Sequence, residues 1–424
     1  MTTLPARLVT AALAAASVLA FSPVALAASP PITRQAAAAK AAFLAYAPAP
    51  AGGPKALCLV DTGVNPTPDT TPGLLSATAL DGGTGNDVDT LTHGTIDAAI
   101  AGGAGHGVLG AWPQLKIVSI RATDNPGAGQ QTSYQFDDYG RAIQSCSFPR
   151  ADPQVAAIAI PLASTIPPTP DQVETFNDAV GKAQTKDIAI LAAAGNQSGP
   201  VQLPGSQPGI LPVGAGDTVS GGVCADTASV GLTFFAPGCF VDQIDTAGNT
   251  FCCGNGTSQA SSFASGVLVA LRSYARTLTA AQATQLLVST AHNGHLDATA
   301  AFRAAGLGAI VDAGNAAIPK PAAPPPPAAV AAPPTALTGT LARPRVKRAT
   351  WRRGVLVITL RGSLPKGARL HAKLTFTRRK AMFLRSTRPT LRARTPLPRR
   401  VVIHLSVGAA SSATVPVKVR RVRR

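Results

Sequence analysis

The sequence predicts an α/β fold in three layers, built on a doubly wound, mostly parallel sheet and followed by a Pro-rich linker and a small basic β-rich module. From residue 56 to about 316, short apolar runs alternate with longer amphipathic stretches, which is typical of strand-helix-strand units. Residues 338–424 hold 24 Lys and Arg and no Asp or Glu, whereas residues 1–337 hold 14 basic and 20 acidic residues. The 424 residues also exceed what one hydrophobic core usually serves, so at least two folding units are expected.

The N-terminus has the pattern of a secretory signal peptide over residues 1–27. Arg7 supplies the positive charge, Leu8 to Leu19 the apolar stretch, and Ala25 to Ala27 a small-residue cleavage site. A membrane anchor is the alternative, but the apolar run is short for a bilayer span. Residues 28–55 then form a short leader with an Ala-rich, helical piece around Gln35 to Tyr46. We therefore expect an exported protein.

The central region, residues 56–316, is expected to form one domain. Its apolar blocks are continuous, as in parallel strands that are buried on both faces, and they are too short for buried helices. The predicted strands are Ala56 to Val60, Lys116 to Arg121, Val155 to Ile160, Asp187 to Ala193 and Ile210 to Ala215. The predicted helices include Ser133 to Cys146, Asp171 to Thr185 and Ala260 to Leu278.

The C-terminal part begins with a Pro/Ala-rich linker over residues 317–337, which predicts an extended, semi-rigid spacer. The basic segment 338–424 carries strand-like runs separated by Gly, Pro and Ser, and these favour a small all-β module over a disordered basic tail. The runs are Gly354 to Leu360, Leu370 to Thr377, Arg400 to Leu405 and Thr414 to Val419.

The six cysteines favour disulfides, because the chain is expected to be exported. Six cysteines allow about 15 pairings, and the sequence does not choose among them. A zinc site is disfavoured because no Cys-x-x-Cys pair exists. Neither a metal nor another cofactor is expected.

Four motifs together carry the groups that acyl transfer from a peptide requires: a nucleophile, a base, a group that orients the base, and donors for an oxyanion. Asp61 follows a buried strand in Asp-Thr-Gly, and His93 opens an Ala-rich helix in His-Gly-Thr. Asn196 ends Ala-Ala-Gly-Asn after another strand. Ser258 lies in Gly-Thr-Ser-Gln-Ala-Ser at the entry to a helix, whose N-terminus favours negative charge.

The order and setting of these motifs resemble the subtilisin-like serine proteases, also called subtilases or peptidase family S8, over roughly Ala56 to Leu307. Residues 235–238 are similar to the family's Ala-Pro-Gly turn, and residues 294–297 to its closing turn. The resemblance implies a Ser-His-Asp triad in which Ser258 attacks, His93 is the general base and then the acid, and Asp61 orients His93. Asn196 and the Ser258 amide would bind the oxyanion.

The resemblance also implies how substrate binds, namely as an extended strand beside the sheet. The matching edge is Ile160, Pro161, Leu162 and Ala163, and the primary side-chain pocket would include Ala193, Ala194 and Gly195. Small or apolar substrate side chains fit these residues, although core packing explains the same alanines equally well. The chain departs from the family pattern at Pro161, which cannot donate a backbone hydrogen bond, at Ile96 and Asp97, and at Ser262 and Phe263.

Asp69 matches a position that can contribute to calcium binding in the family, but one carboxylate is not a site, and a surface Asp is expected. The predicted function is a secreted or envelope-associated serine endopeptidase whose partners are protein or peptide substrates. The basic residues 338–424 would add binding to an anionic cell-wall polymer or to lipid headgroups. The alternative is a catalytically inactive subtilisin-fold protein that acts through this module alone.

Overall fold

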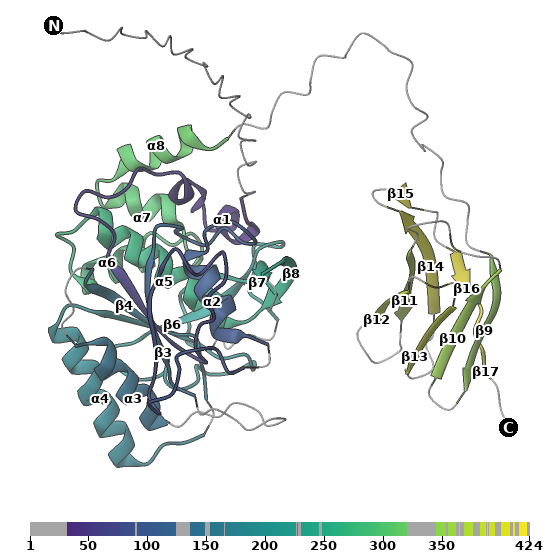
Figure 1. The fold of residues 1–424 in the computed structure, drawn as a ribbon, viewed down its shortest axis with the longest axis horizontal. Coiled ribbons are helices and arrows are strands. Elements are labelled where there is room, and N and C mark those ends of the chain that lie inside the picture. The colour runs from purple at the N-terminus through teal and green to yellow at the C-terminus, as the bar shows by residue number, and fades with distance from the viewer. Residues whose placement is uncertain are drawn as a thin grey trace, which may run out of the picture. The chain divides into compact units, whose positions relative to one another are not determined.

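The computed structural model describes residues 32–319 and 345–421, apart from residues 90, 124–135, 149–152, 165, 226, 228–229, 246–247, 353–354, 362–363, 365–368, 376–381, 387, 389, 395–399, 408–409 and 412–414. The predicted signal peptide and most of the predicted linker lie outside these residues. The chain divides into two compact units, Met1–Pro321 and Ala322–Arg424 (Figure 1). No helix among the described residues has the length and apolarity needed to cross a membrane.

The first unit is built on an eight-stranded sheet with the order β2-β3-β1-β4-β5-β6-β7-β8. All neighbours pair in parallel except β7 and β8. The strands are β1 (Ala56–Asp61), β2 (Leu74–Ala79), β3 (Lys116–Arg121), β4 (Val155–Ile160), β5 (Ala189–Ala193), β6 (Leu211–Asp217), β7 (Phe235–Ile244) and β8 (Thr250–Asn255). The predicted mostly parallel sheet is confirmed.

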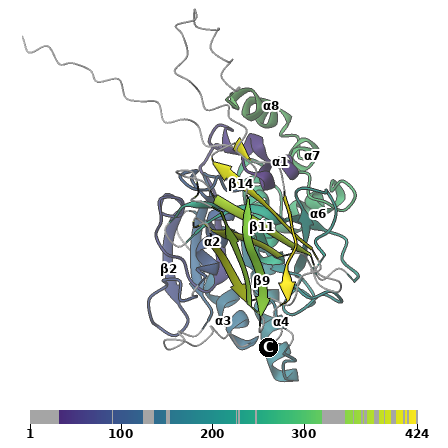
Figure 2. The same cartoon turned by 90° about the vertical axis from the view of Figure 1, so that its right-hand side faces the viewer.

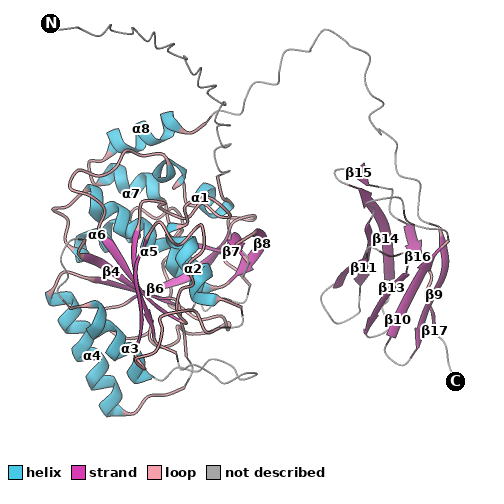
Figure 3. Ribbon diagram, viewed as in Figure 1, coloured by secondary structure: helices cyan, strands magenta, loops and turns pink. Residues whose placement is uncertain are grey.

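Helices cover both faces of this sheet and give the three predicted layers (Figure 3). Leu57 and Leu59 of β1 face a core shared with α2 and α5, while Cys58 and Val60 face a second core shared with α3 and α4. The helical elements are α1 (Arg34–Ala38), the 3₁₀ turn η1 (Ala42–Ala45), α2 (His93–Gly102), α3 (Phe136–Cys146), α4 (Pro170–Thr185), α5 (Thr257–Tyr274), α6 (Ala280–Ser289), α7 (Ala298–Ala304) and α8 (Gly308–Ala317). Two views place α7 and α8 at one end of this unit and α3 and α4 at the other (Figures 1 and 2).

Local chemistry explains where several elements begin. Thr169 and Gln172 form a capping box at the start of α4, with Pro170 in the first turn, and Thr279 and Gln282 repeat the box at α6. Strand β5 begins at Ala189 rather than at the predicted Asp187, because Asp187 has a positive φ of 58° and its carboxylate accepts a hydrogen bond from the Ala280 amide.

Two predicted boundaries were wrong in ways that bear on the site. Helix α5 begins at Thr257, three residues before the predicted start, so Ser258 lies inside its first turn. Residues 235–238 are not a turn. They open strand β7, which pairs with β6 from Gly214 to Asp217.

The predicted leader packs into the first unit. Phe43 is 1% exposed and meets Phe302 of α7 edge-to-face, with ring centroids 5.1 Å apart. Lys40 pairs with Asp297 at 2.5 Å, and the Gln35 side-chain amide exchanges two hydrogen bonds with the backbone of Asp242 in β7. Residues 32–55 therefore contribute to the same core as the sheet.

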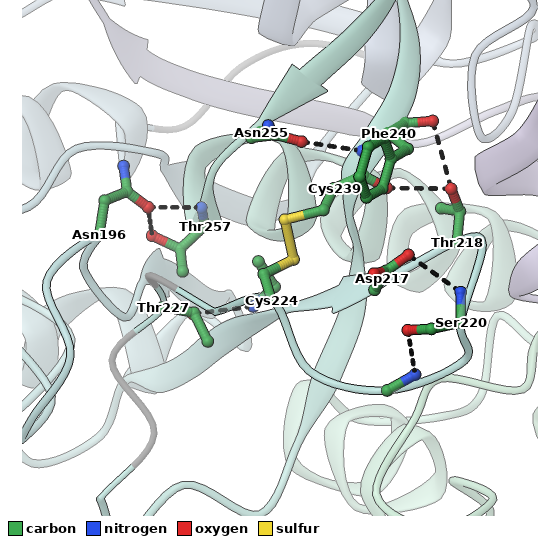
Figure 4. Close-up of a disulfide and its surroundings, with 12 residues drawn as sticks. Asn196, Asp217, Thr218, Ser220, Cys224, Thr227, Cys239, Phe240, Asn255 and Thr257 are labelled. Carbon is green, nitrogen blue, oxygen red and sulfur yellow. Dashed lines mark hydrogen bonds between the residues drawn. A yellow bond between two sulfur atoms is a disulfide. The ribbon is translucent and has the colours of Figure 1, made fainter. Parts of the chain in front are cut away.

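The six cysteines form three disulfides, as the sequence predicted. Cys58 pairs with Cys146 and joins β1 to α3, Cys224 pairs with Cys239, and Cys252 pairs with its neighbour Cys253 in β8. Figure 4 shows the Cys224–Cys239 bridge and, beside it, the hydrogen-bonded turn at residues 217–222.

The second unit is a small all-β structure, as expected. One sheet has the order β13-β10-β9-β17 and the other contains β12-β11-β14-β15, with β16 beside β14. Its core is formed by buried apolar side chains such as Leu356, Ile358, Leu370 and Ile403. The strands are β9 (Val346–Arg352), β10 (Val355–Leu360), β11 (Arg369–Thr375), β12 (Met382–Ser386), β13 (Thr390–Arg394), β14 (Arg400–Val407), β15 (Ala410–Ser411), β16 (Val415–Val417) and β17 (Arg420–Arg421).

Candidate active site

Asp61 and His93 are brought together at the end of the sheet. Asp61 is the last residue of β1 and is fully buried, and His93 is the first residue of α2 with 29% of its side chain exposed. His93 Nδ1 lies 2.8 Å from Asp61 Oδ1, and this oxygen also accepts a hydrogen bond from the Thr62 amide at 2.7 Å. Because Nδ1 is engaged, Nε2 is the ring nitrogen available to a reacting group.

The glycine after His93 is required by the close approach of α2 to β1. A Cβ atom at Gly94 would lie 2.2 Å from the Gly63 carbonyl oxygen and 3.1 Å from Asp61 Cβ. The Gly94 amide also donates a hydrogen bond to Thr62 Oγ1 at 2.9 Å. A side chain at this position would push His93 away from Asp61.

Ser258 lies in the first turn of α5 and is 6% exposed. Helices α2 and α5 meet closely where Gly266 faces Ala101, since a Cβ atom at Gly266 would lie 2.6 Å from the Ala101 carbonyl oxygen. Two helical turns earlier on each helix are Ser258 and His93, so the helix contact favours their proximity. Ser258 and His93, which both lie among the described residues, make no hydrogen bond with each other.

Asn196 is oriented by the residue next to Ser258 (Figure 4). Its Oδ1 accepts hydrogen bonds from the Thr257 amide at 2.8 Å and the Thr257 hydroxyl at 3.0 Å. The Gly195 amide in turn donates to Thr257 Oγ1 at 3.0 Å. With Oδ1 engaged, the Asn196 Nδ2 group is the part of the amide that can donate to a ligand near Ser258.

The electrostatic surroundings of His93 are strongly acidic. Burial lowers its pKa, but the charges of Asp61, Asp97 and Asp89 and the hydrogen bond to Asp61 raise the pKa of His93 to about 10. Asp89 also accepts a hydrogen bond from the His93 amide at 3.3 Å. Sequence reasoning noted Asp97 only as a departure from the family pattern. The sequence feature that could have identified Asp97 is an acidic residue one helical turn after a histidine, inside an otherwise apolar helix.

The predicted substrate edge lies at the end of β4. Ile160 pairs with Ala192 of β5 inside the sheet, and the chain beyond it is no longer a strand. Ser164 exchanges backbone hydrogen bonds with Leu203 at 2.7 and 3.1 Å. Beyond Ile160 the chain therefore leaves the sheet, with Pro161 and Leu162 buried and Ala163 partly exposed.

The predicted pocket residues Ala193, Ala194 and Gly195 are tied into the scaffold. Ala193 is 1% exposed and Ala194 is fully buried, and the Ala194 amide donates to Val213 at 3.1 Å. Gly195 has a φ of 111°, and a Cβ atom there would lie 2.4 Å from the side chain of Gln202. Gln202 therefore borders the predicted pocket, which the sequence alone did not show.

Asp69 is not a surface residue, contrary to the prediction. It is fully buried, and its two oxygens accept hydrogen bonds from four successive amides, those of Gly105, His106, Gly107 and Val108, at 2.7 to 3.3 Å. A carboxylate held by several amides serves to shape the loop around it.

A family model described as the subtilase family matches residues 54–308, a range that includes all the site residues described in this section. The chain belongs to the subtilase family. Among curated relatives of this subtilase, minor extracellular protease Epr of Bacillus subtilis (strain 168) is 25% identical over 221 residues, or 51% of this chain and 32% of that protein. Subtilisin J of Geobacillus stearothermophilus is 29% identical over 210 residues, 48% of this chain and 51% of that protein. The match thus spans between a third and a half of these relatives.

Solved structures show the same fold for this subtilase. The MycP3 protease from the type VII (ESX-3) secretion system superposes with a TM-score of 0.53 at 23% identity, covering 65% of this chain and 89% of that one. MycP1 with its N-terminal propeptide removed gives a TM-score of 0.52 at 20% identity, covering 64% and 96%. At these identities the likeness establishes architecture alone.

Proposed function

We propose that this subtilase is an exported serine endopeptidase that hydrolyses peptide bonds through an acyl-enzyme on Ser258. The observation that carries the proposal is the 2.8 Å contact between His93 Nδ1 and the buried Asp61. A histidine held by a carboxylate through one nitrogen presents the other as a base, which is the arrangement that activates a serine hydroxyl.

In the proposed reaction, His93 Nε2 takes the Ser258 proton as Oγ attacks the scissile carbonyl carbon. Asn196 Nδ2 and the Ser258 amide donate hydrogen bonds to the oxygen as it becomes negative. His93 then delivers its proton to the leaving amine, and water repeats the sequence to release the acid and restore Ser258. The extended substrate would pair with residues 161–163 beside β4 and place one side chain against residues 193–195.

Export is supported by the signal-peptide pattern of residues 1–27 and by the extracellular naming of one relative. We further propose that the second unit binds an anionic cell-wall polymer or lipid headgroups, so that the protein is secreted or retained at the envelope. Exposed cationic side chains on this unit include Arg345, Lys347 and Arg348. The most basic runs, residues 378–380, 399–400 and 420–424, have side chains outside the described residues.

The catalytic proposal is tested by labelling the purified protein with a fluorophosphonate probe and locating the label by mass spectrometry. We expect label on Ser258 and digestion of casein, and the Ser258→Ala variant should lose both, with kcat reduced by about 10⁶-fold. Ser289→Ala, at an exposed serine of α6, is the matched control and should keep both. Folded wild-type protein that neither takes the label nor digests casein would instead indicate an inactive fold that acts through its basic unit.

A further inference from the structure

A second buried carboxyl group lies beside the Asp61–His93 pair. Asp97 follows His93 by one turn of α2, is fully buried, and has its Oδ2 3.6 Å from His93 Nδ1. Asp61, His93 and Asp97 each contribute an oxygen or ring nitrogen to a cluster in which these atoms all lie within 4.8 Å of one another. Two carboxyl groups therefore share one histidine.

If both carboxyl groups are ionised, some of their buried oxygens are left without a hydrogen-bond donor. Asp61 Oδ1 is fully engaged, but Asp61 Oδ2 and both oxygens of Asp97 are buried without a hydrogen-bond partner among the described residues. Ionised carboxylates only accept hydrogen bonds, so the two cannot bond each other. One proton on Asp97 removes the conflict, because the carboxyl O–H can then donate to Asp61 Oδ2 and pair two orphaned atoms at once.

The surrounding charges also favour a proton on Asp97. Burial, together with the charges of Asp61 and Asp87, raises the pKa of Asp97 well above its ordinary value, while His93 acts in the opposite direction. Asp87 is held by the amide and hydroxyl of Thr95, and Asp89 adds another acid beside His93.

Apart from His93, no cation on the described elements packed around Asp97 is available to neutralise it. Arg272 is the one charged residue of α5 and bonds Asp187. On β3, Arg121 pairs with Asp81 and Lys116 bonds the Pro72 carbonyl. On β7, Asp242 pairs with Arg34, and the remaining charge on β1 is Asp61 itself. An ionised Asp97 would thus be a buried charge whose one cationic partner, His93, is shared with Asp61.

The α5 side of the site is polar but neutral. One turn before the Gly266–Ala101 contact, the two helices carry Ser262 and Asp97, and the buried Ser262 hydroxyl has no partner among the described residues. This neutral hydroxyl supplies no positive charge that would stabilise an ionised Asp97.

We propose that Asp97 is a positioning residue of the catalytic centre, which carries a proton and donates it in a hydrogen bond to Asp61 Oδ2. The inference rests on the proposed function of Asp61 and His93. The bond fixes the Asp61 carboxylate through its second oxygen and draws negative charge away from it. His93 is then held in place without the full effect of a second negative charge beside it.

The test is the pH dependence of kcat/KM for wild type, Asp97→Asn and Asp97→Val. The wild-type acid limb should lie well above the ordinary histidine pKa. Asp97→Asn keeps a donor of the same shape and should leave this limb within about 0.3 pH unit, whatever its effect on kcat. Asp97→Val removes the donor, leaves Asp61 a stronger partner for the imidazolium ion, and should move the limb upward by about one unit.

Three results would overturn the proposal. A downward shift of about one unit in Asp97→Asn would mean that the substitution removed a negative charge, so Asp97 is ionised in the wild type. An unmoved limb in Asp97→Val would limit the residue to packing. A profile that depends on added divalent cations would place a metal ion, rather than a proton, between the carboxyl groups.

Infrared spectroscopy provides a readout that does not require activity. The folded wild type at neutral pH should show the carbonyl band of a protonated carboxyl group, and this band should vanish in Asp97→Asn. If casein is not digested but the band is present, the peptidase proposal fails and the protonated Asp97 stands. If casein is digested but the band is missing, the proposal for Asp97 fails alone.

Discussion

At the residue scale, Thr257 connects the groups that the motifs list separately. Its hydroxyl accepts from the Gly195 amide and donates to Asn196 Oδ1, so it fixes the end of β5 to the start of α5. The motifs predicted Asp61, His93, Asn196 and Ser258 as one site, and the structure shows which contacts hold Asp61, His93 and Asn196. Sequence spacing could not reveal the role of Thr257, because its two partners lie about 60 residues away in the chain.

Asn196→Asp is a sharp test at this scale. The new side chain keeps an oxygen for Thr257 but loses the Nδ2 donor, so transition-state binding should suffer while substrate binding is little affected. We expect kcat to fall by about 100 to 1000-fold with a small change in KM. Steady-state kinetics with a chromogenic peptide measures both. Asn315→Asp, at an exposed position of α8, is the control. A loss confined to KM would argue against an oxyanion role.

Asp97 and Asp69 mark the limit of prediction from single residues. Both residues were interpreted from their neighbours in the sequence, and both are buried by contacts that form only when the sheet is assembled. Asp69 receives its amides from residues 105–108, a loop more than 30 positions away. A pattern can locate a strand end or a helix start, but it does not show which distant backbone will satisfy a carboxylate.

At the element scale, the strands that form the centre of the sheet were the best predicted. Strands β3 and β4 have the predicted bounds, because a continuous apolar run flanked by polar residues leaves little choice. Strands β2 and β8 were missed because they are exposed edge strands with mixed composition. Residues 235–238 were misread because Pro237 and Gly238 are turn-forming residues by composition.

The packing of residues 32–55 leads to a prediction for this element. Phe43→Ala should lower the free energy of unfolding of the first unit by about 3–5 kcal/mol, because it empties a site filled against Phe302. Chemical denaturation followed by tryptophan fluorescence measures the change. Phe148→Ala, at a side chain 68% exposed, should cost much less. Equal stability of the two variants would show that this segment is a dispensable leader.

At the scale of the whole molecule, acidic and basic residues are sorted between two units. The prediction that residues 338–424 carry the positive charge follows from counting, and the two units have cores of their own. Their relation in space could not be predicted, since composition alone sets no contact between them.

A chain ending at Pro321 should therefore keep the thermal midpoint of the first unit within about 2 °C and keep its rate on casein. It should lose salt-sensitive sedimentation with anionic cell walls or lipid vesicles, which the full chain is expected to show. Sedimentation across a range of salt concentrations, with neutral vesicles as the control, measures this. Binding that survives the truncation would place the anionic contact on the first unit.

The acidic surroundings of His93 set activity and stability against each other as pH changes. The raised pKa of His93 means that the neutral base becomes available only at a pH well above the ordinary histidine pKa. Stability changes in the opposite direction. The folded chain keeps the proton of His93 above the ordinary histidine pKa of about 6.5, and the proton of Asp97 above the ordinary aspartate pKa of about 3.9. The unfolded chain has released both protons at such pH values. Both stabilising contributions are lost as pH rises through the folded-state pKa of His93 and toward that of Asp97. The protein would thus be least durable under the alkaline conditions that suit its chemistry best, a compromise that the Cys58–Cys146 disulfide, which joins residues 88 positions apart, would soften.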